Sequence, residues 1–375
     1  MSERGGGAGR APVLLAAGGT AGHLFPAEAL AAALSRRGIA VELATDARAA
    51  RFAQDFPATH RHVIPSATLR GRDPWNLAST ASILAWGTLR SWMLLRRMRP
   101  AAVVGFGGYP TIPPVLAAAF LNIPTLIHEQ NGVMGRANRL LAPRVRAIAT
   151  GFPGVVDEGS ALGAKTIVTG DPVRQAVIEA SAIPYPELDP IGHLHLLVFG
   201  GSQGARNMAD IVPAAIERLD LPVRARLRIV QQAREEDLDR VNASYARLGA
   251  SAEVESFFAD LPARIAAAHL VISRAGASTV AELAAVGRPA ILVPLPHALD
   301  QDQLANAQVL HKAGGARVLP QAEFTPERLA SEIAALAGDP DRLVAMAAKA
   351  RAAGTPDAAE RLADLVLRVA GVSKP

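Results

Sequence analysis

Cysteine is absent from the 375-residue chain, which excludes disulfide bonds, thiolate metal sites and a cysteine nucleophile. No run of roughly 18 uninterrupted apolar residues occurs either, so we expect no segment that spans a bilayer. Residues 1–10 are rich in glycine and lack an apolar stretch, which argues against a cleaved export signal. These absences suit a protein of a reducing compartment, in solution or on a surface.

Charged residues make up only 19% of the chain, whereas 50% of its residues are hydrophobic. At roughly 150 residues per domain, this length predicts two globular domains. The net charge of +5 conceals an asymmetry: residues 1–175 hold 19 Lys and Arg against 10 Asp and Glu, and residues 176–375 hold 20 against 24. A basic N-terminal half implies an anionic partner, such as phosphates, an acidic membrane surface or nucleic acid.

Short apolar runs alternate with helical stretches in both halves of the chain, which predicts an α/β protein with two doubly wound, Rossmann-like domains facing a cleft. The expected strands lie at 13–17, 39–45, 102–105, 125–128, 147–150, 194–199, 226–230, 270–273 and 290–293. We expect an N-terminal domain over 11–178, a proline-rich linker over 179–193 and a C-terminal domain over 194–365. Ligands then bind at the carboxyl ends of the strands.

Each predicted domain opens with a strand, a glycine-rich turn and a helix. The first turn is GGTAGH at 18–23, with its helix expected from 26 to 37, and the second is GGSQG at 200–204. Backbone N–H groups and the helix dipole make such turns anion sites, and the hydroxyls of Thr20 and Ser202 add donors. Neither turn matches a dinucleotide or Walker motif, so a tight turn without ligand remains the alternative.

A third strand end enters a helix at 273–282. Glu282 is expected about one turn into this helix, where its carboxylate can accept hydrogen bonds from two ribose hydroxyls. The alternative is a first-turn acid that stabilises the helix dipole, and spacing alone favours this alternative.

Residues 61–99 contain seven arginines, one acid and all three tryptophans. Tryptophan beside arginine suits a bilayer interface, where the ring lies at headgroup level and the guanidinium meets lipid phosphate. The alternative is an ordinary amphipathic helix whose apolar face is core. The expected membrane contacts are Arg70, Arg72, Trp75, Leu77 and Trp86.

The order of six motifs resembles one family closely. The strings are GGTAGH at 18–23, GGY at 107–109, HEQNG at 128–132, GDPVR at 170–174, GGSQGAR at 200–206 and SRAG at 273–276. Over residues 12–365 the chain resembles the MurG family of peptidoglycan N-acetylglucosaminyltransferases, which have the glycosyltransferase B fold.

The resemblance implies a hexosyltransferase that moves GlcNAc from UDP-GlcNAc to undecaprenyl-pyrophosphoryl-MurNAc-pentapeptide (lipid I), with inversion, to give lipid II. It implies a role in cell wall biogenesis, cell shape and cell division. The protein is then peripheral, on an anionic membrane surface at the cytoplasmic face of the bacterial inner membrane. No cofactor, metal or nucleic acid is implied.

The resemblance also implies which residues contact UDP-GlcNAc. Arg174 and the Ser202 loop would bind the diphosphate, and the main chain at Phe258 would contact uracil. The full set is Thr20, Ala21, Gly22, Asn131, Arg174, Ser202, Phe258, Ala277, Ser278, Thr279, Val280, Ala281, Glu282 and Gln303.

An inverting transfer needs a base that takes the proton of the acceptor hydroxyl. His23 ends the first glycine turn, and an imidazole with a pKa of about 6.5 suits this role near neutral pH. Glu129 is the rival base, whereas His128 is expected to be structural. Asp300 and Asp302 are spaced as in metal-dependent transferases, but their loop is more typical of solvated carboxylates.

Three other functions remain open from the residues alone. Glu42 lies about 20 residues after the first loop, where a nicotinamide dinucleotide oxidoreductase has a ribose-binding acid. A UDP-sugar epimerase of the same fold and a non-catalytic nucleotide-sugar or nucleic-acid binding module are the other two.

Overall fold

The computed structural model describes residues 11–19, 21–51, 56–68, 73–189, 191–201, 205–296 and 301–372. Its contacts divide the chain into two compact units. Unit 1 comprises the chain up to Gln130, Met134–Pro172 and Asp357–Pro375, and unit 2 comprises Asn131–Val133 and Val173–Pro356.

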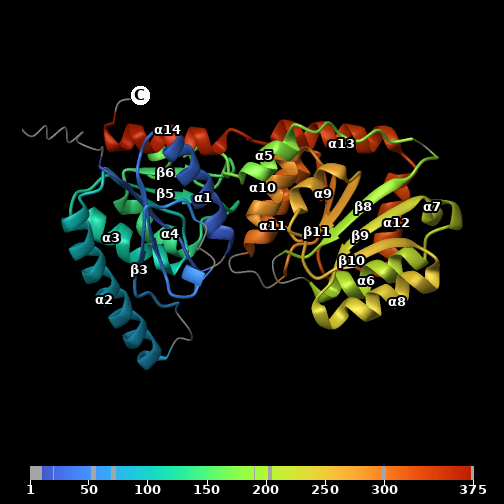
Figure 1. Cartoon of the computed structure of the whole chain (residues 1–375), viewed down its shortest axis with the longest axis horizontal. Coiled ribbons are helices and arrows are strands. Elements are labelled where there is room, and N and C mark those ends of the chain that lie inside the picture. The colour runs from blue at the N-terminus through green and yellow to red at the C-terminus, as the bar shows by residue number, and fades with distance from the viewer. Residues whose placement is uncertain are drawn as a thin grey trace, which may run out of the picture. The chain divides into compact units, whose positions relative to one another are not determined.

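Unit 1 is built on a parallel sheet of seven strands in the order β3-β2-β1-β4-β5-β6-β7 (Figure 1). The strands are β1 (Val13–Ala16), β2 (Val41–Thr45), β3 (His60–Val63), β4 (Ala102–Gly105), β5 (Thr125–Glu129), β6 (Ala147–Thr150) and β7 (Thr166–Val168). The helices are α1 (Ala21–Arg36), α2 (Pro74–Met98), α3 (Ile112–Phe120), α4 (Arg136–Leu141) and α14 (Ala358–Ala370).

Both faces of this sheet are buried. Val13 and Leu15 of β1 pack into one core together with α1 and α14, whereas Leu14 and Ala16 pack into a second core on the other face with α3 and α4. Strands covered on both faces need apolar side chains at successive positions. This requirement explains the unbroken apolar run Val13–Ala16 that the sequence shows.

Unit 2 repeats this arrangement with six parallel strands in the order β10-β9-β8-β11-β12-β13. The strands are β8 (Leu194–Phe199), β9 (Leu227–Gln232), β10 (Ser251–Glu255), β11 (Leu270–Ser273), β12 (Ala290–Leu292) and β13 (Ala316–Val318). The helices are α5 (Gln175–Ser181), α6 (Arg206–Glu217), α7 (Leu221–Arg226), α8 (Leu238–Leu248), α9 (Leu261–Ala267), α10 (Ala277–Val286), α11 (Asp302–Lys312), α12 (Pro326–Ala337) and α13 (Pro340–Ala353).

Each sheet reverses its strand order once, between β1 and β4 in unit 1 and between β8 and β11 in unit 2. At such a reversal point, the chain segments that follow the two adjacent strands run to opposite faces of the sheet. A crevice therefore opens outside the carboxyl ends of these two strands. Both glycine turns follow the first strand of their sheet. The topology therefore brings each turn to the reversal point.

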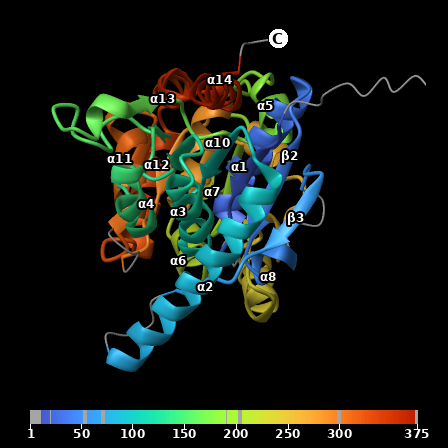
Figure 2. The same ribbon diagram turned by 90° about the vertical axis from the view of Figure 1, so that its left-hand side faces the viewer.

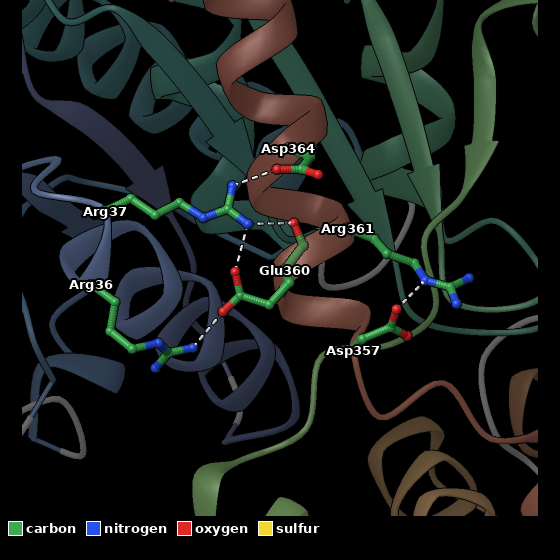
Figure 3. Close-up of polar contacts among 6 residues, drawn as sticks. All are labelled: Arg36, Arg37, Asp357, Glu360, Arg361 and Asp364. Atoms are coloured by element: carbon green, nitrogen blue, oxygen red, sulfur yellow. Dashed lines mark hydrogen bonds and ion pairs between the residues drawn. The ribbon is translucent and has the colours of Figure 1, made fainter. Parts of the chain in front are cut away.

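The C-terminal helix α14 belongs to unit 1 and lies beside α1 (Figure 1). Its buried face contributes Leu362 and Val366 to the core under α1. Figure 3 shows the charged rim of this contact, where Arg37 binds the carboxylate of Asp364 at 2.6 Å and also pairs with Glu360. The expected C-terminal domain over 194–365 is thus wrong at its end, because the chain returns to unit 1 at Asp357.

The other expected boundaries differ as well. Helix α5 and the proline-containing segment after it fall inside unit 2, which begins at Val173 rather than after a linker over 179–193. Arg288 helps to explain why the segment after α5 belongs to unit 2. Its buried guanidinium donates to the carbonyls of Ile183 and Pro184 at 3.3 and 2.9 Å. These hydrogen bonds hold the segment against unit 2.

Candidate active site

The first glycine turn is held by Asp46, the residue that follows β2. Asp46 is buried, and its Oδ1 accepts the N–H of Gly19 at 3.0 Å. A Cβ on Gly18 would lie 2.7 Å from the same oxygen, so only glycine lets the end of β1 come this close. Asp46 was not among the predicted site residues, although its position directly after a strand was the available signal.

Helix α1 begins at Ala21, five residues before the expected start, so His23 lies in its first turn. Pro26 lies inside this helix and has no N–H to donate to the carbonyl of Gly22, four residues earlier. The helix tolerates this loss because Gly22 is exposed, so water can bind its carbonyl instead. The half-buried His23 imidazole places Nδ1 2.9 Å from Oε1 of Gln130. Thr20 lies outside the described residues.

Glu129, the rival base, is a buried residue at the carboxyl end of β5. Its Oε2 accepts hydrogen bonds from the Gly135 N–H at 2.9 Å and from the Asn138 amide at 2.8 Å. The carboxylate therefore fixes the start of α4, which Gly135 precedes. This burial and these donors suit a structural carboxylate.

His128 precedes it and is fully buried. Its Nε2 donates to the carbonyl of Gly170 at 3.0 Å. Burial lowers the pKa of His128 to about 4, and the hydrogen bond to Gly170 only partly opposes this shift. A ring that stays neutral and enclosed near pH 7 agrees with the structural role expected for it.

The second glycine turn, in unit 2, is held in the same way. Gln232 ends β9, is buried, and accepts the Gly200 N–H at 3.1 Å through Oε1, while its Nε2 donates to the carbonyl of Ser256 at 3.1 Å. A polar residue at the end of the second strand thus holds the turn after the first strand in both units. Residues 202–204, including Ser202, lie outside the described residues.

Helix α10 presents a second helix start at the reversal point of unit 2. Its N-cap, Gly276, makes no side-chain capping hydrogen bond. Ala277, Ser278 and Thr279 are half-buried, whereas Val280, Ala281 and Glu282 are buried.

Glu282 forms an ion pair with Arg174, whose Nη2 lies 3.1 Å from Oε1 of the carboxylate. Burial raises the pKa of Glu282, and Arg174 opposes this shift. No acidic residue lies in the first turn of α10. The alternative of a first-turn acid that stabilises the helix dipole is therefore wrong.

Asn131 belongs to unit 2 and is held there by Asn306 of α11. The fully buried Asn306 donates to Oδ1 of Asn131 and to the carbonyl of Ala275, both at 3.1 Å, and accepts the Gly132 N–H at 2.7 Å. These bonds attach Asn131 to the segment between β11 and α10. Asn306 was not among the predicted site residues, because nothing in its local sequence indicates the segment that it contacts.

Two further predicted contacts have their own partners within unit 2. The Phe258 ring is buried, with the Arg264 guanidinium 4.4 Å from its centroid. The half-buried Gln303 accepts the Leu295 N–H at 3.0 Å through its side-chain oxygen.

Glu42 does not lie where a ribose-binding acid would have to be. It is the second residue of β2, and its carboxylate lies 2.6 Å from Nε2 of His62 on β3. The acid at the carboxyl end of β2 is instead Asp46, whose Oδ1 accepts the N–H of Gly19. The dinucleotide interpretation of Glu42 is therefore wrong. Within the described ranges, no group of three or more His, Asp or Glu residues is arranged to hold a metal ion.

Helix α2 presents an apolar surface made of several exposed side chains. Trp75 is 86% exposed, and Leu77, Ile83, Trp86, Leu89 and Met93 are also exposed. The helix extends beyond the body of unit 1 at its N-terminal end (Figure 2). In the described part of the chain, no helix is both long and apolar enough to cross a membrane. Arg70 and Arg72 lie outside the described residues.

An apolar groove of about 590 Å³ lies beside this surface, formed by α2, α3 and Leu140 of α4. Trp92, Leu116 and the exposed Phe120 are among the residues that line it. Arg96 stacks over Trp92, with its guanidinium carbon 4.7 Å from the ring centroid. The groove thus continues the apolar surface of α2.

Two doubly wound parallel sheets, each with a glycine turn at its reversal point, define the glycosyltransferase B class of fold. Residues 13–150 match the glycosyltransferase family 28 N-terminal domain, and residues 195–362 match the C-terminal domain of the same family. The chain belongs to glycosyltransferase family 28. The predicted fold class and enzyme class are confirmed.

Curated relatives match the chain over nearly its whole length. The UDP-N-acetylglucosamine--N-acetylmuramyl-(pentapeptide) pyrophosphoryl-undecaprenol N-acetylglucosamine transferase of Rhodopseudomonas palustris (strain BisB18) is 61% identical over 361 residues, which cover 96% of each chain. The protein of the same name from Nitrobacter hamburgensis is 57% identical over 363 residues, which cover 97% of this chain and 98% of the relative.

Solved structures agree with this. The crystal structure of Acinetobacter baumannii MurG is similar with a TM-score of 0.79 and 31% identity, over 95% of this chain and 99% of that one. A putative UDP-N-acetylglucosamine 2-epimerase from Listeria monocytogenes has a TM-score of 0.66 at 15% identity, over 98% of each chain. The epimerase likeness shows the fold alone.

Proposed function

We propose that the chain transfers GlcNAc from UDP-GlcNAc to the lipid-linked acceptor lipid I, with inversion at the anomeric carbon, to form lipid II. The observation that carries this proposal is the 61% identity, over 96% of both chains, to a relative named for this reaction. Neither the epimerase nor the oxidoreductase alternative has comparable support.

His23 is the general base in this proposal. Its imidazole is half-buried at the reversal point of unit 1. Among the described residues, its Nε2 has no hydrogen-bond partner, so that atom can accept the proton of the acceptor hydroxyl. Glu129 is the weaker candidate, because its carboxylate is enclosed and holds the start of α4.

Unit 2 binds the donor in this proposal. Arg174 neutralises charge that develops on the departing diphosphate, and the uncapped N-terminus of α10 adds backbone N–H groups and the helix dipole. Glu282 accepts hydrogen bonds from the ribose hydroxyls. The Arg174–Glu282 pair fixes both side chains before the donor arrives.

The activity is tested by transfer of radiolabelled GlcNAc from UDP-GlcNAc to a soluble lipid I analogue. We expect a labelled disaccharide product with a β-linkage, together with one UDP per transfer. Conversion of UDP-GlcNAc to its 2-epimer without acceptor would contradict the proposal in favour of the epimerase alternative.

We also propose that unit 1 docks on the anionic cytoplasmic face of the membrane through α2. The exposed Trp75, Leu77 and Trp86 supply apolar contact, and the groove beside α2 extends it. Arginines near the surface attract anionic lipid by about 1 kcal/mol each. Docking of this kind lets lipid I reach the enzyme without leaving the bilayer.

Sedimentation with anionic vesicles tests the docking. We expect binding that weakens with salt and is lost when Trp75→Ala is combined with Arg70→Glu and Arg72→Glu, while transfer to a soluble acceptor persists. The control places the same kinds of change on unit 2, as Leu221→Ala with Arg247→Glu and Arg342→Glu. Equal release by both variants, or no vesicle binding at low salt, would contradict the proposed surface.

A further inference from the structure

Gln130 joins the His23 ring to the end of a neighbouring strand. It follows β5 and is 3% exposed. Its Nε2 donates to the carbonyl of Phe106 at 3.1 Å, and its Oε1 lies 2.9 Å from Nδ1 of His23. Phe106 follows β4, so the amide bridges the segment after β4 and the first turn of α1. All three residues lie in unit 1.

This bridge determines which ring nitrogen carries the proton. A carbonyl oxygen only accepts, so the Gln130 amide nitrogen must face Phe106 and the amide oxygen must face His23. An amide oxygen cannot donate, so Nδ1 of His23 carries the proton. In the neutral ring, Nε2 then has the free lone pair.

The same ring lies close to Gly107 and Gly108, where any added side chain would meet it. A Cβ on Gly108 would lie 3.3 Å from Cδ2 and 3.4 Å from Nε2 of His23, and one on Gly107 would lie 3.5 Å from Cε1. Both glycines have positive φ angles, of 82° and 73°, that L side chains rarely adopt. The ring therefore has the glycine backbone at 107–108 on one side, and its Nδ1 faces the buried side-chain amide of Gln130.

We propose that Gln130 is a positioning residue that holds His23 in the Nδ1–H tautomer and so directs the basic Nε2 toward the acceptor. The inference rests on the proposed base role of His23. During transfer, the acceptor hydroxyl gives its proton to Nε2 while its oxygen attacks the anomeric carbon. The bond from that carbon to the diphosphate breaks, and its electron pair leaves with UDP.

A neutral partner at Nδ1 also has a chemical consequence. A carboxylate at this position would stabilise the imidazolium and raise the pKa of His23, because an opposite charge within hydrogen-bonding distance favours the charged form by roughly 1–3 pH units. An amide fixes the tautomer without adding a negative charge.

The tautomer can be measured without any activity assay, by long-range ¹H–¹⁵N NMR correlation of the ring nitrogens. The chain has nine histidines, and the His23 signals are those missing from His23→Gln. We expect Nδ1–H in the wild type, loss of this preference in Gln130→Leu, and Nδ1–H with an upward pKa shift in Gln130→Glu. The matched control is Gln231→Leu, because buried Gln231 also bridges a ring hydroxyl and a backbone carbonyl, but in unit 2.

Kinetics supply a second readout. We expect Gln130→Leu to lower kcat by roughly 10–10³-fold with little change in KM for UDP-GlcNAc. In Gln130→Glu, the acid limb of the kcat/KM profile should move to higher pH, with activity recovered above it. Nε2–H in the wild type, an unchanged tautomer in Gln130→Leu, or an unmoved acid limb in Gln130→Glu would overturn the inference. Full turnover by His23→Gln would instead contradict the base role, which is a separate outcome.

Discussion

The buried ring of His128 makes the stability of unit 1 depend on pH. Burial lowers its pKa from 6.5 to about 4 in the folded protein. Below about pH 6.5 the unfolded chain binds a proton that the folded chain does not, so stability is complete above that pH and falls as the pH drops toward 4. With these values, the loss at pH 5 is roughly 2 kcal/mol relative to pH 8.

The substitution His128→Gln tests this account, since a glutamine amide can still donate to the Gly170 carbonyl. We expect the variant to lack about 2 kcal/mol of the wild-type loss between pH 8 and 5. Tryptophan fluorescence during urea unfolding reports on unit 1, because all three tryptophans lie in α2. The control is His60→Gln, which removes an exposed ring and should keep the wild-type pH dependence. Parallel pH profiles of His128→Gln and wild type would refute the reasoning.

Two other predictions concern donor binding and the return of the chain to unit 1. Arg174→Ala and Glu282→Ala should each weaken UDP-GlcNAc binding by about 1–3 kcal/mol in calorimetry, and by less than the sum when combined, because each single change already breaks the ion pair that the two residues share. Unchanged affinity in both single variants would remove them from the site. Leu362→Ala should lower the urea stability of unit 1 by about 2–5 kcal/mol, whereas exposed Val344→Ala should change stability by less than about 0.5 kcal/mol. Equal effects would contradict the packing of α14.

The inner strands could be predicted from the sequence because burial on both faces demands apolar runs. The expected strands at 102–105, 147–150, 194–199 and 270–273 match the structure to the residue. The four strands that the prediction omitted, β3, β7, β10 and β13, are the outer strands of the two sheets. His60–Val63 and Ser251–Glu255 are largely exposed and polar, so no apolar run distinguishes them from loops.

The division into domains could not be predicted from the sequence at the C-terminus. Helix α14 has an amphipathic pattern that requires a core, but the pattern does not say which core. The core is decided by contacts with α1 and with Arg37, the residue after it, which lie more than 300 positions away from Leu362 and Asp364. Local patterns contain no information about a partner so distant in the chain.

The glycine turns were predictable because backbone geometry restricts them to glycine. The polar residues that hold them were not. Asp46, Gln232 and Asn306 each bond a backbone N–H at least 27 positions away, and Gln130 meets His23 across 107 positions. Their roles depend on the strand order, which the sequence indicates only in outline.

The rate of GlcNAc transfer by His23→Ala, at saturating UDP-GlcNAc and soluble lipid I analogue, tests the central claim most directly. We predict a kcat lower by roughly 10²–10⁴-fold with donor affinity nearly unchanged, because the base is lost while the residues that bind the donor in unit 2 remain. Glu129→Gln, which keeps an acceptor for the Gly135 N–H, should retain most of the turnover. Near-normal turnover in His23→Ala together with loss of turnover in Glu129→Gln would contradict the account and assign the base to Glu129.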